Sequence, residues 1–225
     1  MIKGFLTLLW SIVFFYHGYA QIHILDSAST IQQVMNMSDL EPWKVVKQDD
    51  DITLKYRWLK IGGELKTRAL SIHFTSETHT DTLLSYLVNT EKHNEWNKGI
   101  KAFKILAKDS TNLNWITHTK YDIPFPISQQ DLVVNNALMV SDSLLIIDIT
   151  SKPNYIPSLE DSDRIKHYIA QWKVYPIDSN TIDITFSAIT LSKSYIPRFI
   201  KDPIIQNNFI KSFKALKSSL EYNNP

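Results

Sequence analysis

Six strand-like segments follow one another in the second half of the chain, and no helical segment interrupts them. In each, apolar or β-branched residues recur at alternate positions, and the connections are rich in Pro, Asp, Asn and Ser. Parallel pairing would need long crossover connections, so these short turns favour antiparallel pairing. The predicted strands are residues 100–106, 114–122, 130–140, 144–151, 165–175 and 181–190.

Two helices and three further strands are predicted before this run. The first helix is short, and the second is amphipathic because its leucines and a valine fall on one stripe. The predicted elements are residues 26–38 (helix, capped by Ser27 or Ser29), 44–47, 52–59 and 65–74 (strands, the last two joined at Gly62-Gly63), and 79–96 (helix, capped by Thr80 or Asp81).

The C-terminal segment returns to helical spacing. Pro197 is predicted to begin one turn, and Asp202-Pro203 to cap a following stretch that can hinge at the proline. Its apolar stripe should pack on the sheet, with Lys211, Lys214 and Lys217 on a solvated face; the stripe is Ile205, Phe209, Phe213, Leu216 and Leu220. The element order predicts an α+β fold in which a curved antiparallel sheet of about nine strands wraps around this helix.

The N-terminus has the layout of a signal peptide. Lys3 precedes an apolar stretch at residues 5–16, which closes with Gly18-Tyr19-Ala20. We therefore expect residues 1–20 to be removed on export to the periplasm or the exterior, leaving one domain at residues 21–225. An uncleaved N-terminal anchor is the alternative, and it would leave the same domain tethered outside the cytoplasm.

Composition excludes several functional classes. The chain has no cysteine, which rules out disulfides, a thiol nucleophile, a thiolate metal site and an acylated lipoprotein cysteine. The formal net charge is +1 with charges scattered along the chain, so there is no electrostatic case for nucleic acid as a partner. We expect a monomer without a cofactor or metal.

Residues 121–133 read Tyr-Asp-Ile-Pro-Phe-Pro-Ile-Ser-Gln-Gln-Asp-Leu-Val, an aromatic and proline-rich turn followed by Asp131. This segment resembles the signature of START (StAR-related lipid-transfer) domains. The chain departs from the family at Gln130, where Arg is usual, so an ion pair made by that Arg would be absent. Asp131 is expected to accept hydrogen bonds from nearby backbone amides. Supporting matches are Trp43, the helix end Asn94-Glu95-Trp96-Asn97, residues 172–176 and Ile196-Pro197-Arg198.

The resemblance implies a helix-grip fold with an internal apolar cavity that holds one lipid, sterol or similar molecule, with transient membrane contact. An ordinary packed core would produce the same apolar stripes. On the strands, Tyr168, Trp172 and Phe186 should point inward, and Phe209 and Phe213 should face them from the last helix. A cavity has few polar groups to orient its ligand. The polar candidates are Thr117, Thr119, Asn135 or Asn136, and Arg164.

No catalytic motif is present in the sequence, so we expect a binding protein. Glu91, His93 and Glu95 lie at alternate helical positions and do not converge; they are expected at the polar end of an exposed helix. One alternative is a cyclase- or hydrolase-like enzyme of the wider helix-grip superfamily, which needs a buried acid or base facing the cavity, with Asp148 or His167 as candidates. Another is an interaction module whose cavity is filled by side chains.

Overall fold

The computed structural model describes residues 30–61, 65–111, 113–125, 127–141, 143–191 and 197–222. The predicted signal peptide, the Ser27 or Ser29 cap, the Gly62-Gly63 turn, Pro126 and Ile196 lie outside these residues.

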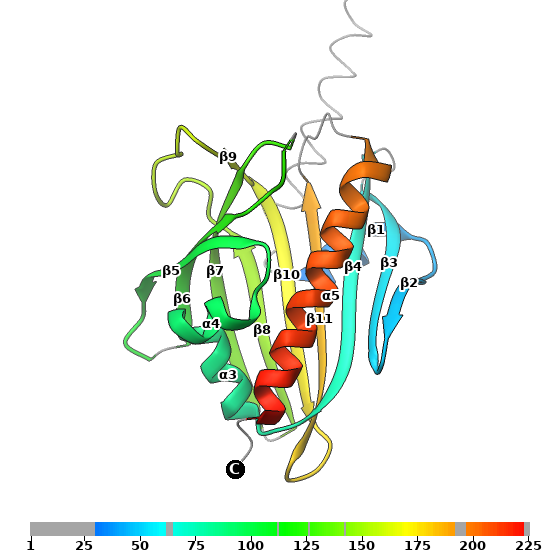
Figure 1. Cartoon of the computed structure of the whole chain (residues 1–225), viewed down its shortest axis with the longest axis vertical. Helices are drawn as coiled ribbons and strands as arrows, with labels where there is room; N and C mark the ends of the chain where they lie inside the picture. The colour runs from blue at the N-terminus through cyan, green and yellow to red at the C-terminus, as the bar shows by residue number, and fades with distance from the viewer. Residues whose placement is uncertain are drawn as a thin grey trace, which may run out of the picture.

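One large antiparallel sheet forms the body of the protein (Figure 1), and it is curved without closing into a barrel. Its strand order is β1-β3-β4-β11-β10-β8-β7-β6-β5, with β2 added to β3 and β9 paired in parallel with β7. All nine predicted strands are confirmed, and the short β1 and β9 are additional. The strands are β1 (Ser38–Leu40), β2 (Lys44–Asp49), β3 (Ile52–Ile61), β4 (Leu65–Glu77), β5 (Ile100–Lys108), β6 (Asn114–Tyr121), β7 (Gln130–Ser141), β8 (Leu144–Ser151), β9 (Asp163–Arg164), β10 (His167–Pro176) and β11 (Thr181–Leu191).

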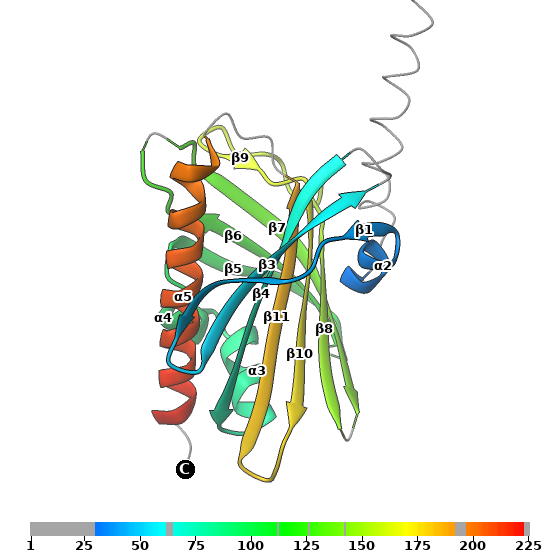
Figure 2. The same ribbon diagram turned by 90° about the vertical axis from the view of Figure 1, so that its right-hand side faces the viewer.

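The helices cover both faces of the sheet (Figure 2). The long α5 (Arg198–Tyr222) crosses the inner face beside α3 (Thr80–Val88) and α4 (Thr90–Trp96), while α2 (Ile31–Asn36) lies on the outer face. Several predicted helix boundaries are wrong. The helix expected to reach residue 38 ends at Asn36, and Ser38 begins β1. The single helix expected at residues 79–96 is divided at Asn89, whose side chain caps α4, and α3 begins after His79, so neither Thr80 nor Asp81 is its cap. None of the described helices is long and apolar enough to span a membrane.

The two faces of the sheet carry separate apolar cores, as strand alternation requires. On β10, Ala170, Trp172 and Val174 join the inner core, whereas Ile169 joins the outer one. This confirms the predicted inward face of β10. The outer core packs Ile31, Val34 and Met35 of α2 against the sheet. The inner core fills the space beneath α3, α4 and α5, and the candidate site lies within it.

Helix α5 is continuous, so the predicted break before Pro203 is wrong: Pro203 lies inside the helix. Phe213, Leu216 and Leu220 are buried as predicted, but Ile205 is 39% exposed, and Ile210, which is outside the predicted stripe, is buried. The lysine face is not simply solvated. Its ion pairs join the helix to the β2–β3 turn: Lys214 to Asp49 (2.8 Å) and Asp50 (3.5 Å), and Lys217 to Asp51.

Candidate ligand-binding cavity

A cavity of about 110 Å³ lies between the inner face of the sheet and the α3–α4 pair. Its floor comes from β5, β6, β7, β8, β10 and β11, and its wall comes from the two short helices. Aromatic and aliphatic side chains make up most of the lining. The lining residues are Leu87, His93, Trp96, Asn97, Phe103, Trp115, Thr117, Thr119, Tyr121, Leu132, Val134, Asn136, Ile147, Ile149, Tyr168, Trp172 and Phe186.

The structure brings together some of the predicted site residues and separates others. Those that line the cavity are Thr117, Thr119, Tyr168, Trp172 and Phe186. Of the two asparagines left open by the sequence, Asn136 lines it and Asn135 does not. The lining also excludes Arg164, Phe209 and Phe213.

Strand register explains the choice between the asparagines. Trp115 is paired with Asn136, and Thr117 with Val134, so these residues share the inner face. Asn135 is paired with Ile116 and therefore belongs to the outer face. The Asn136 side-chain amide donates to the Trp115 carbonyl (3.1 Å) and to the Thr117 hydroxyl (3.3 Å). One predicted polar residue is thus already held by a cavity neighbour.

Phe209 and Phe213 form a second aromatic layer between the cavity and α5. The Phe213 ring centroid lies 5.5 Å from that of Trp172, 5.7 Å from Phe186 and 6.0 Å from Trp96. Phe209 lies 6.2 Å from Phe186 and 6.0 Å from Phe213. These rings fill space that a larger cavity would occupy, so the helix covers the site through its phenylalanines.

His93 is the functional candidate that sequence reasoning placed wrongly. It is only 9% exposed, and its ring stacks on Phe103 with centroids 3.6 Å apart. Burial lowers the pKa of His93 to about 3, so the imidazole is neutral at physiological pH. The available signal was its three-residue spacing from Trp96, which places both rings on one face of α4.

The Asn97 side-chain amide lies 3.0 Å from His93 Nε2 and forms a hydrogen bond with it. Nδ1 is buried and has no hydrogen-bond partner among the described residues. Two other polar rings of the lining are also neutral. Burial raises the pKa of Tyr121 to about 12, and burial together with Tyr121 raises that of Tyr168 well above its ordinary value.

Asp131 and Arg164 form an ion pair on the outer face, outside the cavity. The Asp131 carboxylate is fully buried, and one of its oxygens accepts from Arg164 Nε and from His118 Nε2, both at 2.8 Å. Arg164 also donates to the carbonyls of Pro153, Ile156 and Pro157. The expected backbone-amide partners of Asp131 are therefore wrong, and so is a ligand-facing Arg164.

Neither residue proposed as a cavity acid or base lies in the lining. Asp148 accepts a hydrogen bond from the Gln171 amide at 2.6 Å, on the face opposite Ile147 and Trp172. Burial raises the pKa of Asp148, and the Gln171 hydrogen bond and the Lys173 charge partly oppose this shift. His167 begins β10 and is likewise not a lining residue. No group of His, Asp and Glu among the described residues could hold a metal ion.

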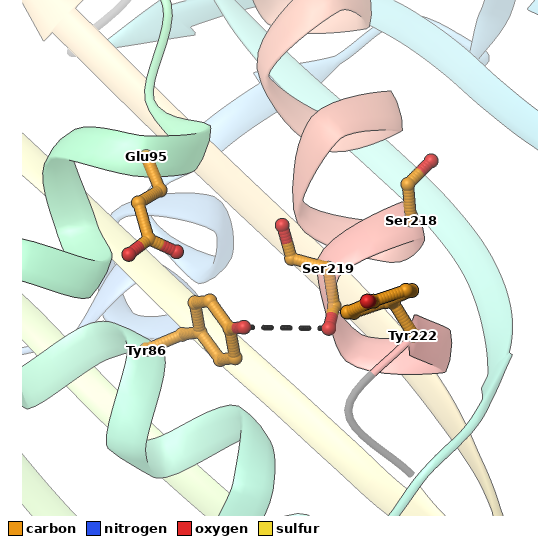
Figure 3. A pocket seen from close by; sticks show the side chains of 5 residues that line it. All are labelled: Tyr86, Glu95, Ser218, Ser219 and Tyr222. Atoms are coloured by element: carbon orange, nitrogen blue, oxygen red, sulfur yellow. Dashed lines mark hydrogen bonds between the residues drawn. The ribbon is translucent and has the colours of Figure 1, made fainter.

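A second hollow of about 450 Å³ opens to solvent where α5 ends (Figure 3). Tyr86 and Glu95 come from α3 and α4, and Ser218, Ser219 and Tyr222 come from α5. The Tyr86 hydroxyl points across the gap and donates to the Ser219 carbonyl (3.3 Å), and the Tyr86 carbonyl accepts from the Trp96 indole. This groove is shallow and does not enclose a ligand, but its hydrogen bonds connect α5 to the cavity wall.

Comparison with solved structures identifies the fold. A STAR-related lipid transfer protein fragment from Xanthomonas axonopodis superposes with a TM-score of 0.68 at 19% identity, covering 80% of this chain and 99% of that chain. The chain has the START fold. Human StAR-related lipid transfer protein 5 shares this fold with a TM-score of 0.66 at 12% identity, covering 91% of this chain and 96% of that chain.

An enzyme also has a similar fold. The Zhui aromatase/cyclase from a Streptomyces species superposes with a TM-score of 0.51 at 10% identity, over 69% of this chain and 94% of the enzyme. In sequence, an uncharacterized Pseudomonas aeruginosa protein is 20% identical over 190 residues, which are 80% of this chain and 88% of that protein. No family model matches the sequence.

Proposed function

We propose that this protein binds one apolar small molecule in the inner cavity and carries it outside the cytoplasm. The observation that carries the proposal is the lining itself: a partly open, mostly aromatic and aliphatic surface between the sheet and the α3–α4 pair, in a START fold. Removing apolar area from water stabilises such a complex by roughly 25 cal/mol per Å², without specific contacts. The signal-peptide layout of residues 1–20 supports the export part of this proposal.

Binding of a whole lipid requires the cavity to expand. Its volume of about 110 Å³ is below the range of about 300–1,000 Å³ that drug-sized ligands occupy. Expansion requires two groups of helices to move: the α3–α4 pair, which lines the cavity, and α5, which packs on that side through the aromatic second layer and the Tyr86–Ser219 hydrogen bond. We propose that α5 opens as a lid by bending at Pro203, where the missing backbone donor weakens the helix.

Native mass spectrometry of the mature protein, purified from its own source, tests the carrier function. We expect one ligand molecule per protein molecule, which organic extraction should release for identification. The same spectrum gives the N-terminal residue, which should be Gln21 if the signal peptide is removed. A ligand-free protein that also takes up no lipid from mixed vesicles would overturn the carrier proposal.

Two exposed phenylalanines favour membrane contact at one end of the molecule. Phe125, in the β6–β7 connection, is 96% exposed, and Phe199, in the first turn of α5, is 78% exposed. Both segments lie at the end where α5 begins (Figures 1 and 2). We expect the variant Phe125→Ser/Phe199→Ser to sediment less with phosphatidylcholine vesicles while retaining its fold. Equal sedimentation of the variant and the wild type would contradict this role.

Catalysis is the second candidate, because the aromatase/cyclase superposes on this chain and His93 lines the cavity. A general base works best when its pKa lies near the working pH. At a pKa of about 3, His93 is a weak base at neutral pH, and both tyrosines hold their protons tightly. The titration properties of the lining therefore favour binding over acid–base chemistry.

A further inference from the structure

We propose that the cavity selects a small, neutral, ring-containing ligand and rejects anionic ligands such as fatty acids. This inference rests on the proposed binding function and names the ligand class of the same site. Three properties of the lining carry it: its charge, its volume and the shape of its walls.

The lining offers no opposite charge to an ionised ligand. Among the residues that the structure describes, none of those lining the cavity is Asp, Glu, Lys or Arg. His93 is neutral, and so are Tyr121 and Tyr168. An unpaired charge moved from water into such a site costs several kcal/mol, so a carboxylate or phosphate would bind poorly.

A buried cation on the outer face of the sheet, Arg164, is already neutralised. Arg164 is held by the Asp131 carboxylate and by the carbonyls of the segment 153–157. Asp131 and its partner His118 lie on the outer face of β7 and β6, because Leu132 and Thr117 next to them line the cavity. The backbone of both strands therefore separates this ion pair from a bound molecule.

Polar groups are nevertheless present, and all of them are uncharged hydrogen-bonding groups. Thr117, Thr119, Asn97, Asn136 and the two tyrosines contribute hydroxyl or amide groups to the lining. Such a set matches hydroxyl, carbonyl or ring N–H groups on a ligand. Asn136, Thr117 and Asn97 already have hydrogen-bond partners inside the protein. A fully hydrocarbon ligand would therefore leave unpaired only those polar groups that have no internal partner, at a cost of roughly 1–3 kcal/mol for each buried group.

Volume and wall shape favour rings over chains. An apolar cavity of about 150 Å³ holds one benzene molecule, so a cavity of about 110 Å³ must enlarge slightly to take one ring, and its walls must move further to take a second fused ring. The walls are flat aromatic faces: the Trp172 and Phe186 centroids are 4.7 Å apart, and Trp96 meets Trp172 edge-on at 6.3 Å. Flat rings pack against such faces with offset or edge-to-face geometry.

A pair of probes of matched shape tests the charge preference. We would titrate the mature protein at pH 7 with 2-naphthol and with 2-naphthoate by calorimetry, and add hexadecanoate as the chain-shaped anion. A phenolic hydroxyl with a pKa near 10 stays neutral, whereas a carboxylic acid with a pKa near 4 is ionised. We expect naphthol to bind and naphthoate to bind at least about 100-fold more weakly, the equivalent of about 2.8 kcal/mol.

A cavity-filling variant locates the binding. Leu132→Trp enlarges a lining residue and should abolish naphthol binding, whereas Met139→Trp, at the exposed end of the same strand, should leave it unchanged. Equal binding by both variants would place the probe elsewhere and overturn the inference. A circular dichroism spectrum of each variant confirms that its sheet is intact.

The outcomes separate this inference from the proposed function. If naphthoate or hexadecanoate binds as tightly as naphthol, the preference for neutral rings is wrong while apolar-ligand binding stands. The same holds if no probe binds but the protein carries a lipid from its source. If no probe binds and no lipid is found, both proposals fail. Naphthol binding that is lost only in Leu132→Trp, with weak naphthoate binding, supports both.

Discussion

The two faces of β6 and β7 bury different kinds of polar group: charged side chains on the outer face and uncharged ones on the inner face. On the outer face, His118 and Arg164 both bond to one oxygen of the buried Asp131 carboxylate, whose other oxygen has no hydrogen-bond partner among the described residues. On the inner face, Thr117 and Asn136 belong to a lining that has no charged side chain among the described residues. The same strands therefore carry a fixed structural cluster on one side and an uncharged, adaptable binding surface on the other.

This difference indicates where stability and binding reside. A buried charge is tolerated only when its partners are fixed, so the outer cluster should resist change. Neutral polar groups cost less when they lack a partner, so the inner face can exchange partners when a ligand enters. Substitutions on the two faces should accordingly differ in their cost in folding free energy, which makes the contrast measurable.

The largest effect is expected from Asp131→Ala, which leaves Arg164 and His118 without their shared carboxylate. Removing one member of a buried ion pair costs about 3–5 kcal/mol of unfolding free energy, measurable by urea denaturation. The matched control is Asp161→Ala, whose carboxylate is mostly exposed and lies 4.0 Å from Lys120; it should cost less than about 1 kcal/mol.

If Asp131→Ala does not fold, His118→Gln serves as the milder test. It retains a side-chain donor and the Arg164–Asp131 pair, so we expect an intermediate loss of about 1 kcal/mol. Losses for Asp131→Ala and Asp161→Ala that agree within error would show that the outer cluster has no special structural role.

A smaller effect is expected from the pH dependence that His93 confers. Its pKa is about 3 in the folded state and about 6.5 when unfolded, so the unfolded chain binds the proton first as pH falls. Stability from this group is complete above pH 6.5 and declines between pH 6.5 and 3. From pH 7 to pH 5 the loss is about 2 kcal/mol.

The variant His93→Gln isolates this contribution from other titrating groups. Glutamine does not titrate, so the stability difference between wild type and variant should shrink by about 2 kcal/mol between pH 7 and pH 5. Urea denaturation at both pH values measures it. A difference that stays constant would mean that His93 is not buried in its neutral form.

Most of the fold could be predicted from the sequence, because it depends on periodicity. All nine predicted strands and the inward face of β10 are confirmed, since alternation over ten residues specifies a face clearly. The division of the helix at Asn89 was missed for two reasons. The apolar stripe of α3 continues without a break, and a single asparagine is a weak capping signal. Pro203 was misplaced because a proline near a helix start can begin it or lie within its early turns.

The site was less predictable because it depends on which face a residue occupies. Strand β7 is apolar on both faces, so its own pattern could not separate Asn135 from Asn136; only the register with β6 does. Arg164 was misassigned because a lone polar residue in sequence does not reveal a partner 33 positions away. His93 was missed because short helices lack enough turns to define a buried stripe.

The smallest effect compares two threonines on the inner face. Thr117 accepts a hydrogen bond from the Asn136 side-chain amide, and Thr117→Val removes this acceptor. The variant should therefore lose about 1 kcal/mol of unfolding free energy. Thr119 also lines the cavity, and no side-chain hydrogen bond to it is present among the described residues, so Thr119→Val should change the unfolding free energy by less than about 0.5 kcal/mol. Thermal or urea unfolding of both variants, with naphthol titrations in parallel, distinguishes their roles. If the Thr119 hydroxyl serves a ligand, its loss should weaken binding without lowering stability, whereas equal stability losses would mean that both threonines are structural.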